Sequence, residues 1–280
     1  MTATAPAPSA MPEVRETRVS PLAVFGALLR RDMVVLGHRL GEFLPRTILQ
    51  PLLLVFVFTR VLPEIGQGFG GSAARAGAFS TLLVPGVIGS VILFQGIQAV
   101  ALPLVQEFGY TKEIEDRVLA PLAMEWVAIG KVVSGALQCL LAALIVFPIA
   151  KFVPSAPIDL QLNWPVLITF LPLACVASSA LGLTFGTAFE PRTVPMLFGV
   201  VVVPLTFLGC VYFTWQQLEA IPWLQIVVLV NPLVYINEGL RAALTPVPTM
   251  SLVVVYGVMT AFTVLLLWLG ISGFRRRVLS

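Results

Sequence analysis

Charged residues are rare in this chain of 280 residues, which excludes most soluble folds. Asp, Glu, Lys and Arg make up 11% of the sequence and hydrophobic residues 58%, whereas soluble proteins use roughly 25% charged residues. Uncharged runs occupy 47–59, 76–106, 132–150, 160–189, 193–218, 220–237 and 242–274. Most approach or exceed the roughly 20 residues that cross a bilayer core as a helix. We therefore expect an all-α, polytopic membrane protein, because lipid offers backbone groups no partners and these runs lack the alternation of barrel strands.

Histidine, cysteine and phosphate-binding motifs are also scarce. The three cysteines lie within apolar runs, and the single histidine, His38, is interpreted as a surface residue. The motif G-x-x-x-x-G-K-[ST] is absent, since Gly130-Lys131 is followed by Val132 and lacks the upstream glycine. No carboxylate pair or His/Glu relay lies within a span, which disfavours a proton-coupled secondary carrier. We expect no catalytic residue, metal or cofactor in this chain, and nucleic acid is not an expected partner.

The apolar runs predict six spans, at about 44–63, 78–105, 126–150, 164–189, 194–213 and 250–273. The stretch 220–237 is not counted, because Pro222, Asn231 and Pro232 would break a straight lipid-facing helix. It is predicted to belong to an external re-entrant or interfacial hairpin at 214–249. Arg46 and Arg60 flank the uncharged run 47–59, lie just inside the two ends of the first span and are expected to extend toward opposite headgroup layers.

The distribution of basic residues predicts the orientation. With six spans, only Arg60, Arg75, Lys151 and Arg241 of the 17 basic residues lie on one side, which leaves 13 on the other, including Arg275, Arg276 and Arg277. Lys and Arg are enriched on the cytoplasmic side of membrane proteins. Both termini are therefore expected to be cytoplasmic, with the protein in the inner (plasma) membrane.

Several segments outside the spans have distinct compositions. Residues 1–20 are rich in Ala, Pro, Thr and Ser and predict a disordered cytoplasmic tail, and 274–280 form a basic tail. Residues 21–43 mix charges with apolar side chains at helical spacing. They predict an amphipathic interfacial helix, which serves either as an anchor alone or also as a contact for a cytoplasmic partner. The six-span membrane domain is predicted at 44–273.

Residues 107–122 interrupt the apolar sequence with charge. Ile114, Val118 and Leu122 recur at helical spacing among charged neighbours, which predicts a short amphipathic helix. A solvated linker would need no apolar stripe, so we favour a helix that packs into a partner or under the bundle.

Polar residues within two of the spans are candidates for the lining of a cavity. Gln95 and Gln98, with Phe94 beside them, lie in the second span, and Thr206 and Phe207 lie in the fifth. Intramembrane amides are costly unless paired or wet, so they either line a cavity or form interhelical hydrogen bonds.

Two further patterns concern the later part of the chain. Glu238 and Arg241 are spaced i, i+3 in the hairpin, where they are expected to pair and to form an external gate. The small residues Ala174, Ser178, Gly182 and Gly186 recur every four positions in the fourth span. Such spacing favours close helix packing, either within a bundle or at a dimer seam.

The chain contains two motifs, at 82–135 and at 231–244 (NPLVYINEGLRAAL). They resemble motifs of the type-2 ABC transporter permeases, in particular of the drug-resistance and nodulation-factor exporters. In the first, Glu113-x-x-x-Arg117-x-x-Ala120-Pro121 precedes Gly130-Lys131 in the family's order. The likeness covers nearly the whole chain. It implies the membrane subunit of an ATP-driven exporter, built from two permeases, identical or homologous, and two cytoplasmic ATPase subunits that bind ATP and Mg.

In that family the helix after the second span couples the permease to the ATPase. The resemblance places this coupling helix at 107–122 and assigns it the residues Glu107, Glu113, Ile114, Asp116, Arg117, Val118 and Leu122. The chain departs from the common pattern at Gly109-Tyr110-Thr111-Lys112, where many members have Gly-Thr before the acidic residue. It also lacks the Trp-rich entry to the first span that polysaccharide exporters have, and this absence favours an amphipathic drug-like or lipid-like cargo. The resemblance implies that the cargo is moved by alternating access. The alternatives are polysaccharide or glycolipid export and a non-translocating regulatory subunit.

Overall fold

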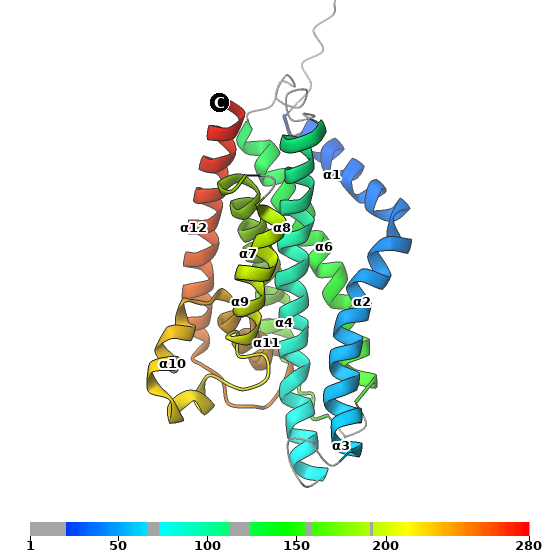
Figure 1. The fold of residues 1–280 in the computed structure, drawn as a ribbon, viewed down its shortest axis with the longest axis vertical. Coiled ribbons are helices and arrows are strands. Elements are labelled where there is room, and N and C mark those ends of the chain that lie inside the picture. Colours follow the sequence, from blue (N-terminus) through cyan, green and yellow to red (C-terminus); the bar gives the residue numbers. More distant parts are fainter. Residues whose placement is uncertain (1–20, 66–72, 112–123, 155–157, 191–192, 280) are drawn as a thin grey trace, which may run out of the picture.

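The computed structural model describes residues 21–65, 73–111, 124–154, 158–190 and 193–279. All regular secondary structure in these ranges is helical, which confirms the predicted all-α class. Figure 1 shows the long helices side by side, with α1 and the end of α12 at the same end of the bundle. The predicted tail at 1–20 lies outside the described residues.

Five helices are long and apolar enough to cross a membrane, among the described residues. The first is α2 (Leu40–Phe56), continued by the π-helical turn η1 (Val57–Val61) and α3 (Leu62–Glu64). The others are α4 (Ala73–Gln106) with the π-helical turn η2 (Glu107–Thr111), α6 (Met124–Phe152), α7 (Trp164–Ala188) and α12 (Leu252–Leu279). They correspond to the first four predicted spans and the last one.

The predicted fifth span is shorter than expected. It consists of α8 (Val194–Leu197), the π-helical turn η3 (Phe198–Val202) and α9 (Val203–Phe207). The helical segment therefore ends at Phe207 instead of near 213. It is shorter than the roughly 20 residues that a straight span needs. The chain leaves the helix through Gly209 and Cys210, whose φ of 54° is left-handed and unfavourable for a residue with a side chain.

The predicted hairpin is a series of short helices. It contains the 3-10 helix η4 (Gln216–Ala220), α10 (Pro222–Val227), the 3-10 helix η5 (Val228–Val230) and α11 (Pro232–Leu244). The segments Pro222–Val230 and Pro232–Leu244 meet at 96°, since Asn231 is extended and Pro232 supplies no backbone N–H. A bend of this size fits a broken span or a re-entrant loop, and Figure 1 shows α10 at the end of the molecule opposite α1.

The predicted interfacial segment at 21–43 is divided in two. Helix α1 covers Pro21–His38, and α2 begins at Leu40 after a non-helical Arg39. Figure 1 shows α1 running obliquely beside the bundle before the chain turns into α2. Phe25 of α1 packs edge-on against Trp126 of α6, with ring centroids 5.8 Å apart.

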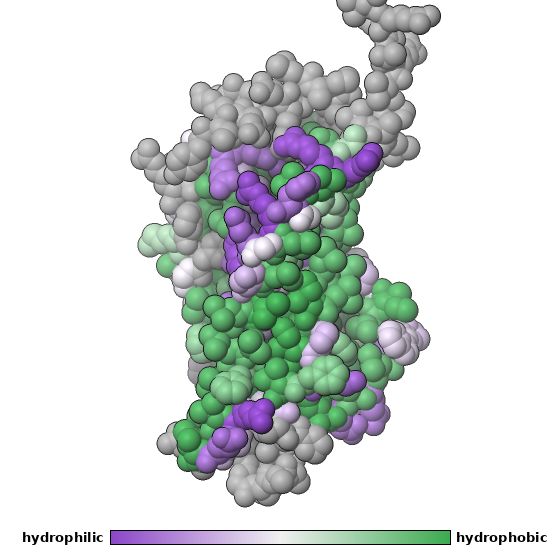
Figure 2. Space-filling view, turned by 90° about the vertical axis from the view of Figure 1, so that its right-hand side faces the viewer, coloured by the Kyte–Doolittle hydropathy of each residue, from purple (hydrophilic) through white to green (hydrophobic). Residues whose placement is uncertain are grey.

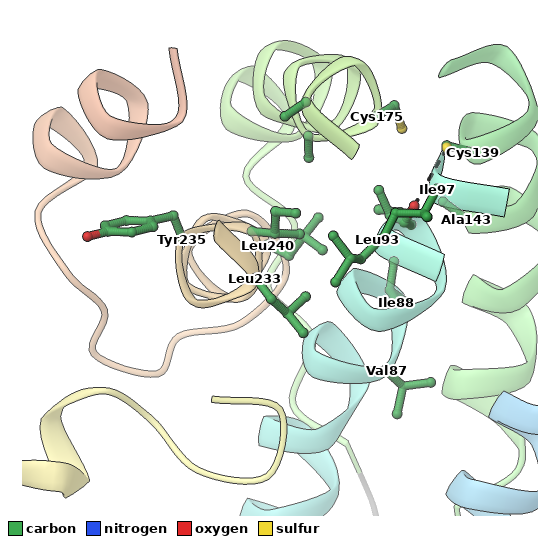
Figure 3. Close-up of a cluster of buried hydrophobic side chains, with 14 of the residues drawn as sticks. Val87, Ile88, Leu93, Ile97, Cys139, Ala143, Cys175, Leu233, Tyr235 and Leu240 are labelled. Atoms are coloured by element: carbon green, nitrogen blue, oxygen red, sulfur yellow. Dashed lines mark hydrogen bonds between the residues drawn. The ribbon is translucent and has the colours of Figure 1, made fainter. Parts of the chain in front are cut away.

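The core is centred on α4, which packs against α6, α7 and α11. Figure 3 shows Val87, Ile88, Leu93 and Ile97 among side chains from the other three helices, and the same buried cluster includes Tyr235 of α11. Cys139 of α6 lies 3.6 Å from the Ile92 carbonyl oxygen. No disulfide joins the three cysteines, all of which are buried.

Two glycines set the distance between α4 and α7. A Cβ added at Gly96 would lie 2.5 Å from Ser178 Cβ, and one at Gly182 would lie 2.7 Å from the Gly96 carbonyl oxygen. Real Cβ atoms do not approach other atoms so closely, so only glycine fits this crossing. The small residues at 174, 178, 182 and 186 are thus buried inside one chain, and the structure assigns them to bundle packing instead of a dimer seam.

Candidate functional site

A polar cavity of about 550 Å³ lies between α1 and α2 on one side and α4 and α6 on the other. Four basic residues line it, Arg31, Arg39, Arg46 and Lys131, together with three acidic residues, Asp32, Glu42 and Glu107. Four amide side chains complete the polar lining: Gln95, Gln98, Gln106 and Gln138. Figure 2 shows hydrophilic side chains reaching from one end of the molecule down into the apolar face on the side of α1 and α2.

Arg46, whose extension toward the headgroups stays a prediction, is exposed, and its guanidinium donates a hydrogen bond to Gln98 Oε1 on α4. Pro45 precedes it within α2, and Phe43 is buried on the same helix. Because of its hydrogen bond to Gln98, the Arg46 side chain lies against α4, and its charge lines the cavity.

The structure brings together only part of the predicted substrate path. Gln95 and Gln98 both line the cavity, and Phe94 beside them packs against the main core. Thr206 donates to the carbonyl oxygen of Val202 in its own helical segment at 2.9 Å, and Phe207 is 63% exposed. Neither Thr206 nor Phe207 lines this cavity. A role for these five residues in transport remains a prediction.

Glu238 and Arg241 form the ion pair that their spacing predicts, but they are fully buried instead of lying at the surface. Arg241 Nη1 donates to Glu238 Oε1 at 2.8 Å, and both side chains are 0% exposed. Arg241 Nη2 also donates to the carbonyl oxygens of Cys210 and Phe213. Glu238 in turn accepts from the backbone N–H groups of Trp215 at 3.3 Å and Met250 at 3.0 Å.

Asparagines of the same region hold the chain that leaves α9. Asn237 Nδ2 donates to the Gly209 carbonyl oxygen at 2.6 Å, and Asn231 Nδ2 donates to that of Leu205 at 2.7 Å. Asn231 Oδ1 also accepts from the N–H of Leu233, which caps the N-terminus of α11. Asn231, the N-cap residue of α11, thus binds a carbonyl that the end of α9 leaves without a helical partner, and Asn237 binds one in the chain that follows α9.

The start of the predicted coupling segment is held by the ends of two other helices, α6 and α12. Glu107 pairs with Lys131 of α6 at 2.5 Å. Phe108 packs edge-on against Phe274 of α12 at 5.8 Å, and the Arg277 guanidinium lies over the Phe108 ring at 5.4 Å. Arg277 also donates to the carbonyl oxygens of Gly186 and Phe189 at the end of α7.

The rest of that segment lies outside the described residues. Glu113, Ile114, Asp116, Arg117, Val118 and Leu122 fall in 112–123, so their helical arrangement and their role in coupling stay predictions. Glu107 is the predicted coupling residue that the structure places, at the junction between α4 and this segment.

Three functional candidates were not identified from the sequence. From the sequence, Arg46 is treated as a flanking charge and Arg277 as part of a topology signal, and Asn237 is given no role beyond its place in the 231–244 motif. Asn237 and Arg241 belong to the 231–244 motif, which is the one signal that pointed to this region. In the described part of the chain, no group of three His, Cys, Asp or Glu residues is arranged to hold a metal ion.

Comparisons with known proteins agree with this architecture. Residues 24–245 match the family described as ABC-2 type transporter. The chain is also similar to proteins named inner membrane transport permease YadH, from Escherichia coli strain K12, E. coli O157:H7 and Shigella flexneri. Each is 26% identical over 233 residues, which cover 81% of this chain and 86% of the relative.

Proposed function

Because the chain belongs to the ABC-2 type transporter family, it is a permease subunit and not itself the ATPase, and we propose that it exports an amphipathic compound. The cargo is drug-like or lipid-like and leaves the cytoplasm or the inner leaflet. Two such permeases, identical or homologous, work with two cytoplasmic ATPase subunits, which bind ATP and Mg. ATP binding by the partners moves the coupling segments and switches the permeases between inward and outward access.

The observation that carries this proposal is the polar cavity within an apolar bundle. Charged and amide side chains inside a membrane are costly, and they mark transport pathways when they face a cavity. Here Gln95 and Gln98 line a cavity that also holds Arg46 and Lys131. The same lining includes Val35, Leu36 and Phe43, so both parts of an amphipathic molecule meet suitable side chains. Cargo shifts the two access states only by its different affinity for each.

Reconstitution tests the proposal. The permease, purified with its ATPase into liposomes, is expected to move amphipathic compounds in an ATP-dependent manner, and such compounds are expected to stimulate ATP hydrolysis. Stimulated ATP hydrolysis without transport would favour the alternative of a non-translocating regulatory subunit. Transport of a glycolipid alone would favour the alternative of polysaccharide or glycolipid export. Gln95→Leu with Gln98→Leu should weaken both activities, and Gln216→Leu, in the hairpin away from the cavity, is a matched amide control. Unchanged export and stimulation in the double variant would remove these residues from the path.

The orientation rests on the basic residues and is tested by cysteine labelling. Single cysteines introduced at positions 2 and 276 are expected to react only after cells are permeabilised, and one at 219 in intact cells. The three native cysteines are buried, so their background labelling should be low. Labelling at 219 only after permeabilisation would contradict the topology.

A further inference from the structure

The cavity carries positive charge at the start of the first span. Arg46 is exposed and lies in the first two turns of the stretch Leu40–Glu64, which is long enough to cross a membrane. A guanidinium has five N–H donors, and Gln98 Oε1 accepts from only part of them. Glu42 precedes Arg46 by one helical turn, yet no ion pair joins them, and among the described residues Arg39 forms none either.

The acidic residues of the cavity do not cancel this charge. Its lining holds four basic and three acidic residues, an excess of one positive charge. Lys131 and Glu107 neutralise each other across 2.5 Å. The excess therefore lies with the arginines of the α1 and α2 wall. Arginine suits carboxylate and phosphate oxygens in particular, because its planar fork binds them through two hydrogen bonds.

The cavity also offers an apolar surface next to these arginines. Phe43 is buried beside it, and Leu102 lines it from α4. Further along α2, Leu49 and Leu53 are 58% and 52% exposed. An alkyl chain can follow this apolar face while a charged head stays at the arginines. A cationic head would instead meet the excess of positive charge.

We infer that the cavity binds the anionic headgroup of an amphiphile, a phosphate, sulfate or carboxylate, between Arg39, Arg46 and Gln98. For transport the inference rests on the proposed function, and it narrows the exported class to anionic amphiphiles. Binding itself depends on the cavity alone, so it is measurable without the ATPase.

The test uses the full-length permease in phosphatidylcholine nanodiscs, with empty nanodiscs as background. Three radiolabelled probes are compared: dodecyl phosphate, dodecyltrimethylammonium with the same chain and opposite charge, and inorganic phosphate without a chain. Variants Arg46→Gln and Arg39→Gln remove one charge each. Arg60→Gln is the matched control, because Arg60 lies on the same span and does not line the cavity.

Dodecyl phosphate is expected to bind saturably and at least about tenfold more tightly than the other two probes. Arg46→Gln should weaken it by about tenfold or more, the effect of a charge-assisted hydrogen bond, and Arg60→Gln should not. Arg39 is exposed at a helix break, so Arg39→Gln carries the test if Arg46→Gln does not fold.

Equal binding of dodecyltrimethylammonium, or unchanged binding in both arginine variants, would overturn the inference. Equal binding of inorganic phosphate would overturn its amphiphile part and indicate a site for a free anion. If dodecyl phosphate binds as expected but the complex with the ATPase does not export it, the binding inference stands and the proposed export of this class fails.

Discussion

Exchanging the two charges of the buried pair, Glu238→Arg with Arg241→Glu, is expected to leave the protein unstable. A Coulomb attraction between two side chains is symmetric, so an isolated pair would survive the exchange. The surroundings of this pair are not symmetric. Arg241 donates to the carbonyl oxygens of Cys210 and Phe213, while Glu238 accepts from the N–H groups of Trp215 and Met250.

The magnitude follows from these four backbone partners. After the exchange a carboxylate faces two carbonyl oxygens and a guanidinium faces two N–H groups. Each buried polar group left unsatisfied costs about 1–3 kcal/mol, so the four together lower the free energy of unfolding by about 4–12 kcal/mol. A single Arg241→Met, which strands the Glu238 charge, is expected to cost about 3–5 kcal/mol. The double exchange should therefore be no more stable than the single variant.

Thermal unfolding in detergent measures this prediction, with the folded fraction followed by size-exclusion chromatography after heating. The control exchanges Arg60 and Glu64, which are exposed four positions apart at the end of the first span. Substitutions at such sites change stability by about 0.5 kcal/mol or less. Recovery of the wild-type unfolding temperature in the Glu238→Arg, Arg241→Glu variant, with a low temperature in Arg241→Met, would refute the role given to the backbone partners.

Three further predictions concern packing and coupling. Gly96→Ala should destabilise the protein by about 1–3 kcal/mol through overpacking. The control Gly257→Ala, which has nothing within 4 Å of the added Cβ, should not lower the unfolding temperature. Equal effects of the two variants in heat denaturation would contradict the close crossing of α4 and α7. Lys131→Ala removes the ion pair with Glu107, and we expect reduced cargo-stimulated ATP hydrolysis with normal membrane insertion. Stimulation at the wild-type level would exclude a role for this ion pair. The triple variant Glu113→Ala, Asp116→Ala, Arg117→Ala should insert into the membrane normally, but the ATPase subunit should no longer co-purify with it. A normal ratio of permease to ATPase, together with normal transport, would exclude the assignment of 107–122 as the coupling helix.

Most of the helical architecture could be predicted from the sequence. Spans depend on the length and hydropathy of a run, which are properties of a single segment, so four spans and the last one were placed within a few residues. The hairpin was predicted because Pro222 and Pro232 prevent a continuous helix there. These features need no knowledge of neighbouring segments.

The residues whose roles were missed depend on partners far away in the chain. Asn231, Asn237 and Arg241 hold the end of α9 and the chain after it by binding the carbonyls of Leu205, Gly209, Cys210 and Phe213, and no local pattern shows this. Arg46 turns inward because Gln98 lies opposite it on α4. The spacing of Glu238 and Arg241 predicted their pairing, but their burial follows from the segments that cover them.

The glycine crossing of α4 and α7 constrains how force passes through the molecule. Helices that interlock at Gly96 and Gly182 cannot slide along one another, because each step would push a side chain into space that only a hydrogen atom occupies. A displacement at the Glu107 end of α4 therefore carries α7 with it as one rigid block. Fewer contacts oppose relative motion across the polar cavity between this block and α1 and α2, where the Arg46–Gln98 hydrogen bond and the Phe25–Trp126 ring contact join the two sides.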